Sequence, residues 1–324
     1  MSGTGDAMQE ILAEVLAAVE PHRGEGKVAD YIPALASVDP RKFGIAFAGA
    51  DGQVLGAGDC GEPFSIQSIS KVFTLALALR RVGRDLWDKV GREPSGSAFN
   101  SIVQLEREAG KPRNPLINAG AIATTGQLMG ERSADAAIDE LLAFLREQAG
   151  DEGVHIDDVV ATSEAATGSR NRSLAWFMKT YGILEYDVEA VLGAYFRQCA
   201  VAMSCRQLAR AGLFLAFDGC DPATGREVAA WHNARRINSV MMLCGHYDNS
   251  GEFAYRIGLP GKSGVGGGIL AIAPGHGAIA VWSPGLNQYG TSAAGARALE
   301  HLIECTGWSV FAPPGGPGRR EAEE

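Results

Sequence analysis

A serine and a lysine three residues apart, Ser68 and Lys71, stand at the start of an apolar stretch of the chain. Residues three apart lie on one face of a helix, so the two side chains are expected to be neighbours. A serine hydroxyl can attack a carbonyl carbon while a lysine amine takes its proton, which is acyl transfer without a histidine or a metal ion. The spacing therefore predicts a serine nucleophile with a lysine general base.

A second motif, Lys262-Ser263-Gly264, follows much later in the sequence. It resembles the K-T-G strand motif that accompanies S-x-x-K in serine β-lactamases and penicillin-binding proteins. Short motifs often match by chance, and S-x-x-K on its own is a weak signal. The two motifs in this order strengthen the hypothesis of serine chemistry.

The chemistry also needs donors for a developing oxyanion and a neutral lysine. At a helix start, the backbone N–H of Ser68 would face outward with the positive end of the helix dipole. The glycine-rich run 264–268 is the expected source of a second N–H, because glycine allows close backbone approach. Burial would lower the pKa of Lys71, and a nearby cation such as Lys262 would act in the same direction.

Composition, charge and residue spacing exclude several classes of protein. The chain has 324 residues and a net charge of −9, which argues against a nucleic-acid-binding surface. No apolar run is long enough to span a membrane, and the N-terminus lacks the pattern of a signal peptide, so a cytoplasmic protein is expected. None of the six cysteines shows C-x-x-C spacing and the histidines show no ligand spacing, so we expect reduced, mostly buried cysteines and no metal site.

Periodicity and turn signals predict strands near both ends of the chain and helices between them. The predicted helices span 8–20, 69–83, 134–149, 157–166, 172–181, 186–197, 204–216, 226–243 and 293–306. The predicted strands span 43–48, 53–56, 253–257, 268–273 and 278–282, the last three as an antiparallel meander. The Pro/Gly-rich and then charged tail, 311–324, is expected to be disordered.

These elements predict an α/β fold with an antiparallel sheet built from both chain ends, flanked by helices and carrying a largely helical inserted subdomain. One domain would cover 1–310, with 1–67 and about 246–310 forming the sheet part and about 68–245 the helical part. Ser68, at a change from strand to helix, and Lys262, just before a strand, would both face the cleft where the two parts meet.

Several segments resemble the serine-dependent glutaminase family, in order and without large gaps over residues 8–310. They are GKVADYIP (26–33), FSIQSISKVF (64–73), NPLINAGAI (114–122), YFRQC (195–199) and GKSGVGGG (261–268). The resemblance implies a serine β-lactamase/penicillin-binding-protein-like fold and hydrolysis of L-glutamine to L-glutamate and ammonia, a role in glutamine catabolism and glutamate biosynthesis. It implies no cofactor, and a homodimer or homotetramer as the assembly.

The resemblance also implies roles for individual residues. Ser68 corresponds to the nucleophile that forms a γ-glutamyl acyl-enzyme and Lys71 to its general base. Tyr31 and Tyr247 correspond to two hydroxyls close to the nucleophile, and Tyr247 is assigned to catalysis as well as to substrate binding. The other substrate contacts it implies are Tyr31, Asn118, Glu164, Asn171, Tyr195 and the backbone of Val265. These types suit the substrate, because a carboxylate pairs with an α-ammonium while amides and hydroxyls bind a carboxylate.

Structural explanations for the same residues stay open. Glu164 could be an acid at a helix start, Asn118 a turn residue, and Tyr31 and Tyr195 packing residues. Next to Tyr247, His246 is expected to be a bystander. Two other functions also remain, a β-lactam-recognising enzyme, in which Tyr247 would open a Y-x-N-like element, and a glutamine-binding module without catalysis.

Overall fold

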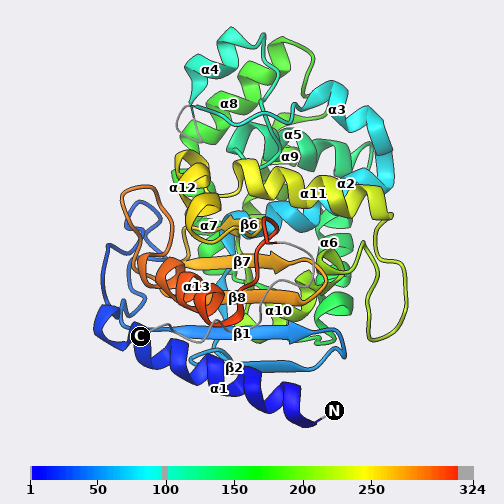
Figure 1. Cartoon of the computed structure of the whole chain (residues 1–324). Helices are drawn as coiled ribbons and strands as arrows, with labels where there is room; N and C mark the ends of the chain where they lie inside the picture. The colour runs from blue at the N-terminus through cyan, green and yellow to red at the C-terminus, as the bar shows by residue number, and fades with distance from the viewer. Residues whose placement is uncertain (1, 97–100, 313–324) are drawn as a thin grey trace.

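A five-stranded antiparallel sheet organises the molecule, which is described here from a computed structural model over residues 2–96 and 101–312 (Figure 1). Its strand order is β2-β1-β8-β7-β6. The strands are β1 (Gly44–Gly49), β2 (Val54–Gly58), β6 (Gly261–Ser263), β7 (Gly268–Ala273) and β8 (Gly277–Trp282). Strand β1 pairs with β8 along its whole length, from Gly44 opposite Trp282 to Gly49 opposite Gly277. The prediction of a sheet built from both chain ends is confirmed.

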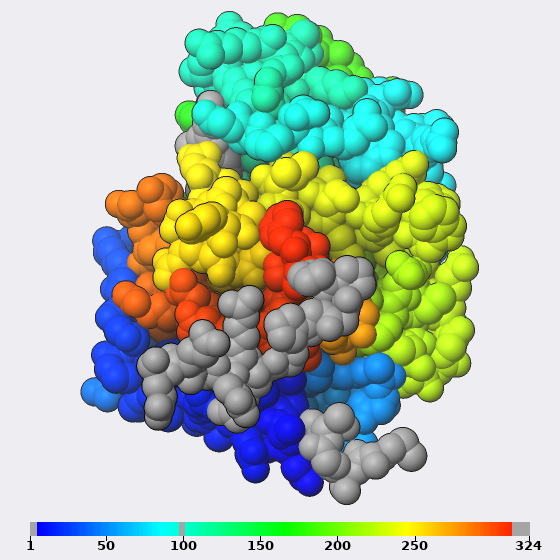
Figure 2. Space-filling model, in the orientation of Figure 1, coloured from blue at the N-terminus to red at the C-terminus, as the bar shows by residue number. Residues whose placement is uncertain are grey.

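Side chains alternate between the two faces of this sheet. On one face Ile45 and Phe47 of β1 pack with Ile279 of β8 under α1 (Ser2–Val19) and α13 (Ala293–Thr306). On the other face Ala46 and Ala48 join the larger core beneath the helical part. The small alanines allow α10 (Cys205–Gly212) to lie against β1 and β8. Figure 2 shows α1 (blue) and the segment around residue 300 (orange-red) on the same surface of the molecule.

Helices build the second part of the molecule, as the sequence predicted. At its centre α2 (Ser70–Val82) is buried from Ser70 to Leu79 and packs on α5 (Asn118–Met129). The surrounding helices are α3 (Leu86–Lys89), α4 (Ile102–Arg107), α6 (Ala134–Ala149), α7 (Asp158–Thr167), α8 (Ser169–Thr180), α9 (Val188–Cys199) and α11 (Trp231–Cys244). Several of them start with side-chain caps, for example Ser133 before α6 and Asp187 before α9.

A small second sheet, absent from the sequence prediction, joins three distant segments in the order β3-β5-β4. Its strands are β3 (Phe64–Ser65), β4 (His155–Ile156) and β5 (Val201–Met203). Strands this short carry too little periodicity to be recognised in a sequence. Through this sheet the segment that leads into α2 is hydrogen-bonded to the chain directly after α9.

The predicted strand 253–257 is wrong, because this segment lies in α12 (Ser250–Arg256) and its C-terminal cap. Phe253 and Ile257 are buried whereas Tyr255 between them is 88% exposed, which is a helical and not an alternating pattern. The third strand of the meander is instead β6, so Lys262 and Ser263 lie within a strand and not just before one.

The boundaries of other predicted helices differ less from those in the structure. The predicted helix 204–216 is α10 followed by a 3₁₀ turn, and the helix predicted from 226 begins at Trp231. The six cysteines are free, and four of them are buried, as expected for reduced thiols. Among the described helices, none combines the length and apolarity that crossing a membrane requires. The predicted disorder of 311–324 concerns a segment that, from 313 on, lies outside the described residues.

Candidate active site

A cavity of about 130 Å³ lies where three parts of the molecule meet. They are the turn that carries the predicted nucleophile Ser68 (called the nucleophile turn below), the helical part and the β6–β7 loop. All eight residues that the sequence assigned to substrate contacts line it. They are Tyr31, Ser68, Asn118, Glu164, Asn171, Tyr195, Tyr247 and Val265. Three of these, Tyr31, Tyr247 and Val265, also line a neighbouring cavity of about 370 Å³. Residues from seven segments of the chain therefore converge on one small polar space.

Ser68 occupies a one-turn 3₁₀ helix, η2 (Gln67–Ile69), between β3 and α2. Gln67 just before it has φ of +50°, a conformation that is costly for a residue with a side chain. The hydroxyl of Ser70 donates to the Gln67 carbonyl at 2.7 Å and stabilises this turn. The turn places Ser68, 8% exposed, on the wall of the cavity.

The glycine-rich loop after β6 lies directly against the nucleophile turn. A Cβ on Gly264 would stand 2.4 Å from the Ile66 carbonyl oxygen, and one on Gly266 would stand 2.1 Å from that of Ser65. Only glycine allows this approach, as the sequence predicted. Between these glycines, the Val265 N–H donates to no backbone carbonyl of the described residues. Val265 lines the cavity.

Lys71 is the second residue of α2 and is 1% exposed. Its Nζ donates to Asn118 Oδ1 at 2.8 Å and to the Leu116 carbonyl oxygen at 3.4 Å. Burial lowers the pKa of Lys71 to about 8, although the nearby Cys199 and Glu164 act in the opposite direction. A substantial fraction of this amine is therefore neutral near physiological pH.

Tyr247 faces Ser68 from the turn η5 (Tyr247–Asn249), and its own φ is +56°. Burial raises the pKa of Tyr247 to about 12, and hydrogen bonds with Ser68 and Ser263 oppose that increase. The phenol is thus protonated at neutral pH and in hydrogen-bonding contact with the predicted nucleophile.

Lys262 lies behind Tyr247 and is fully buried in β6. Its Nζ stands 4.3 Å from the centre of the Tyr247 ring and donates to the Gly245 carbonyl oxygen at 2.9 Å. Burial lowers the pKa of Lys262 well below its usual value, and the charge of Lys71 adds to that effect. The sequence predicted that Lys262 helps to lower the pKa of Lys71. In the structure burial alone lowers the pKa of Lys71.

Asn118, Asn171 and Glu164 supply further polar groups to the cavity. Asn118 Nδ2 donates to Asn171 Oδ1 at 2.9 Å, so the amide of Asn118 joins Lys71 to Asn171. The Glu164 carboxyl is 8% exposed; burial raises its pKa, while a hydrogen bond from Gln67 and the charge of Lys71 oppose the shift. A single carboxylate in this position suits an ammonium group.

One of the structural explanations fails on this geometry. Glu164 stands in the body of α7, six residues after its first residue Asp158, and not at a helix start. Asn118 is the first residue of α5 and not a turn residue, and its side-chain amide is hydrogen-bonded to Lys71 and to Asn171. The neighbouring His246, by contrast, stacks on Phe253 with ring centres 3.5 Å apart and does not line the cavity.

The two tyrosines at the ends of the cavity differ in exposure. Tyr195 is 2% exposed and its ring lies 5.8 Å from Lys71 Nζ, so it packs in the core and lines the cavity at once. Tyr31 is 55% exposed, yet burial around its hydroxyl raises its pKa. Its position on both cavities places Tyr31 at the mouth of the smaller one.

Sequence reasoning missed Gln67, Arg170 and Cys199, which also line the cavity. Gln67 Nε2 donates to Ser65 Oγ at 3.0 Å, and that hydroxyl donates to the Cys199 carbonyl oxygen at 3.0 Å. Helical spacing would have found Cys199, which stands four residues after Tyr195. Gln67 and Arg170 are sequence neighbours of Ser68 and Asn171, a signal too weak to assign them from the sequence.

The comparisons with known proteins point to one family. The family model described as glutaminase matches residues 26–311. The chain is 61% identical over 304 residues to a glutaminase of Rhizobium rhizogenes, covering 94% of this chain and 98% of that protein. It is 62% identical over 304 residues to the thermolabile glutaminase of Rhizobium etli, with the same coverage.

Solved structures show the same fold. A structure described as a probable glutaminase from Bacillus subtilis complexed with 6-diazo-5-oxo-L-norleucine superposes with a TM-score of 0.84 at 34% identity, over 93% of this chain and 96% of that one. A second probable glutaminase superposes with a TM-score of 0.88 at 40% identity, over 94% and 99% of the two chains.

Proposed function

The chain belongs to the glutaminase family, and we propose that this amidohydrolase cleaves L-glutamine through a γ-glutamyl ester on Ser68, with Lys71 as the general base. The observation that carries the proposal is the shared cavity. Ser68, the oxyanion donor at Val265 and the polar groups for an amino-acid head group all line it, and the buried Lys71 is hydrogen-bonded to one of them, Asn118. No cofactor takes part in the proposed steps.

In the bound substrate, Glu164 pairs with the α-ammonium group and fixes that end of the molecule. Asn171 and Tyr195 are positioned to donate to the α-carboxylate, with Arg170 adding positive charge nearby. The side-chain amide then extends toward Ser68. Glutamine is a small molecule with polar ends and an apolar stem, and a cavity of about 130 Å³ that combines polar side chains with apolar surface suits it.

In the first step the neutral Lys71 accepts the proton of Ser68 as Oγ attacks the amide carbon. Negative charge develops on the amide oxygen, where the Val265 N–H and the N–H of Ser68 stabilise it. Tyr247, protonated at neutral pH, passes a proton to the leaving nitrogen, and Lys71 returns the proton it took from Ser68 to the phenol, so that both groups regain their starting states. Ammonia departs and the ester remains on Ser68.

In the second step water attacks the ester. The neutral Lys71 takes a proton from the attacking water and then delivers it to the Ser68 oxygen as that oxygen leaves. Glutamate and free enzyme result. Asn118 holds the Lys71 amine in place through both steps, since its Oδ1 accepts a hydrogen bond from Nζ in either protonation state.

The experiment measures ammonia release from L-glutamine, L-asparagine and D-glutamine by the purified protein and by Ser68→Ala. We expect turnover of L-glutamine that the variant loses by at least about a thousandfold, the scale for removing a covalent nucleophile. Turnover that survives in Ser68→Ala contradicts the nucleophile assignment. Hydrolysis of nitrocefin in place of glutamine would favour the β-lactam-recognising alternative.

A second experiment uses 6-diazo-5-oxo-L-norleucine, the compound bound in the Bacillus structure. It carries an amino-acid head group and a diazoketone, so Ser68 Oγ would bond to its terminal carbon as nitrogen gas leaves and the serine proton moves to that carbon. Mass spectrometry should find one adduct on the peptide that contains Ser68. A peptide adduct elsewhere in the chain, with Ser68 unmodified, would contradict the proposal.

The fold relationship, the extent of the domain, the assembly and the cellular location are also proposals. The S-x-x-K turn lies beside an edge strand that carries K-S-G, which supports a relationship to the serine β-lactamase fold. We also infer one functional unit over residues 1–310, a homodimer or homotetramer, and a cytoplasmic location; size-exclusion chromatography with light scattering tests the assembly.

A further inference from the structure

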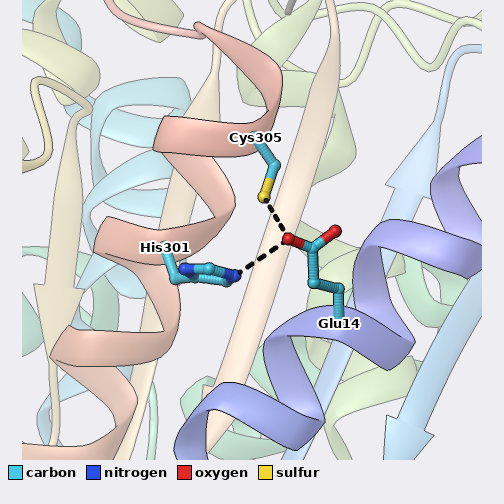
Figure 3. Close-up of side chains that lie close together, drawn as sticks. All are labelled: Glu14, His301 and Cys305. Carbon is cyan, nitrogen blue, oxygen red and sulfur yellow. Dashed lines mark hydrogen bonds and ion pairs between the residues drawn. The ribbon is translucent and has the colours of Figure 1, made fainter. Parts of the chain in front are cut away.

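Three different metal-ligating side chains meet on the surface between the first and the last helix. Glu14 comes from α1, and His301 and Cys305 come from α13, one turn apart on the same helix face (Figure 3). Glu14 Oε1 lies 3.5 Å from His301 Nε2 and 3.7 Å from Cys305 Sγ. The three ligand atoms all lie within 4.8 Å of one another.

These distances match the geometry of a tetrahedral zinc site. Zinc bonds of about 2.0–2.3 Å at tetrahedral angles place neighbouring ligand atoms about 3.4–3.6 Å apart. The two separations from Glu14 already fall within about 0.1 Å of that range, 3.5 and 3.7 Å. The imidazole nitrogen and the thiol sulfur also lie within 4.8 Å of each other, and both come from the same face of α13.

Ordinary hydrogen bonding does not account for the imidazole. His301 Nε2 is shielded from solvent and has no hydrogen-bond partner among the described residues. Its 3.5 Å separation from Glu14 Oε1 is longer than a normal N–H···O bond. A shielded nitrogen without a hydrogen bond, aimed at a carboxylate and a thiol, is what a metal ligand requires.

A second carboxylate stands behind the imidazole. Glu304 Oε2 lies 3.6 Å from His301 Nδ1, on the side of the ring away from Glu14. Metal-ligating histidines usually donate their other ring N–H to a carboxylate, which selects the tautomer and orients the ring. Here that arrangement would leave the Nε2 lone pair facing Glu14 and Cys305.

We propose that Glu14, His301 and Cys305 bind a zinc-class divalent ion, with water as the fourth ligand. One carboxylate, one imidazole and one thiolate favour Zn²⁺ or Co²⁺ over Mg²⁺ and Ca²⁺, which prefer oxygen ligands. The thiol of Cys305 loses its proton on binding, so one proton is released per ion bound at that ligand. Glu14 lies 291 residues before Cys305, and the pair His301 and Cys305 alone is too weak a signal, which is why the sequence predicted no metal.

The ion would connect the two ends of the fold. α1 and α13 cover the sheet face opposite the large helical core, and so they lie away from the catalytic cavity. Binding there would stabilise the packing of α1 on α13 without taking part in amide hydrolysis. We therefore expect a change in thermal stability and none in turnover.

The test titrates the purified enzyme, first stripped with a chelator, with Co²⁺ and then Zn²⁺. Absorption of the Co²⁺ complex should show a thiolate-to-metal charge-transfer band at one ion per chain, and Zn²⁺ should displace it and raise the melting temperature. Cys305→Ser and His301→Ala should lose the band and the rise in melting temperature while keeping full glutaminase activity, which shows that they fold. Glu304→Gln should weaken Zn²⁺ binding about 10- to 100-fold.

The matched control is Cys220→Ser, because Cys220 is the other cysteine that is not fully buried. It should keep both the charge-transfer band and the thermal response. Absence of a band in the wild-type enzyme, or equal Zn²⁺ affinity in Cys305→Ser and the wild type, would overturn the proposal. So would a thermal response that depends on Cys220 instead.

Discussion

Lys71 Nζ and Asn118 Oδ1 are 2.8 Å apart in a site where the lysine has almost no contact with solvent. The amide oxygen stabilises both forms of the amine without adding a charge, and burial then brings the pKa of Lys71 to about 8. A carboxylate in the place of Asn118 would have kept the lysine protonated. A neutral partner therefore suits the role of general base that we propose for Lys71.

The pH dependence of turnover should follow the protonation of Lys71. The base must be unprotonated, so kcat/KM should increase as pH rises through about 8, the pKa of Lys71. Below that value it should fall about tenfold per pH unit. The measurement is the initial rate of ammonia release at substrate concentrations below KM, over the pH range in which the enzyme stays folded. A flat profile between pH 6 and 8 would remove Lys71 as the base.

Replacing the neutral partner by a charged one should move that profile. Asn118→Asp places a carboxylate 2.8 Å from Nζ, which favours the protonated lysine and raises its pKa. The rising limb of kcat/KM should shift to higher pH by one unit or more. Asn118→Ala removes the contact without adding charge, so it should lower activity without that alkaline shift. If kcat/KM rose over the same pH range in Asn118→Asp as in the wild type, the assignment of Lys71 as the base would be contradicted.

Glu164 should act on binding more than on chemistry. Glu164→Gln keeps the shape of the side chain but removes the charge proposed to face the α-ammonium group. The loss of a charged hydrogen bond predicts a KM for L-glutamine about 10- to 100-fold higher, with a smaller change in kcat. Glu152→Gln is the control, because that side chain is 90% exposed. An unchanged KM in Glu164→Gln would take this residue out of the site.

Gly264 should tolerate no side chain. In Gly264→Ala the new Cβ would lie 2.4 Å from the Ile66 carbonyl oxygen, so the β6–β7 loop must move away from the nucleophile turn. We expect a loss of stability of about 1–3 kcal/mol and a lower kcat, because the Val265 N–H moves with the loop. Gly61→Ala, where a Cβ meets nothing within 4 Å, is the matched control. Wild-type kcat in Gly264→Ala would show that the close approach is not needed.

Cys199 should be inert although it lines the cavity. Burial raises the pKa of its thiol to about 12, which leaves about one thiolate in a hundred thousand at pH 7. Iodoacetamide should therefore leave the activity of the native enzyme unchanged over hours and modify Cys220 or Cys305 first, as peptide mass spectrometry would show. Rapid inactivation with an adduct on Cys199 would contradict the burial argument.

Local patterns in the sequence determined most elements of the fold. The helices 134–149 and 293–306 and the strand 268–273 lie within the predicted limits, because each has strong periodicity and clear flanking signals. The segment 253–257 misled the prediction, since five residues of mixed polarity fit a strand and a helix equally well. Only packing decided it, by burying Phe253 and Ile257 and leaving Tyr255 in solvent.

The residues of the site were recognisable from long motifs, but their relations were not. Motifs name Ser68, Lys71 and Asn118, whereas the hydrogen bond between Lys71 and Asn118 depends on how α2 packs on α5. The same holds for the low pKa of Lys71, which arises from burial that no local pattern reports. The cluster of Glu14, His301 and Cys305 exists only because the sheet, built from both chain ends, is covered by the first and last helices together. Sequence therefore determined which groups the chain carries, and tertiary packing decided which of them meet, because contacts between distant segments leave no trace in local periodicity.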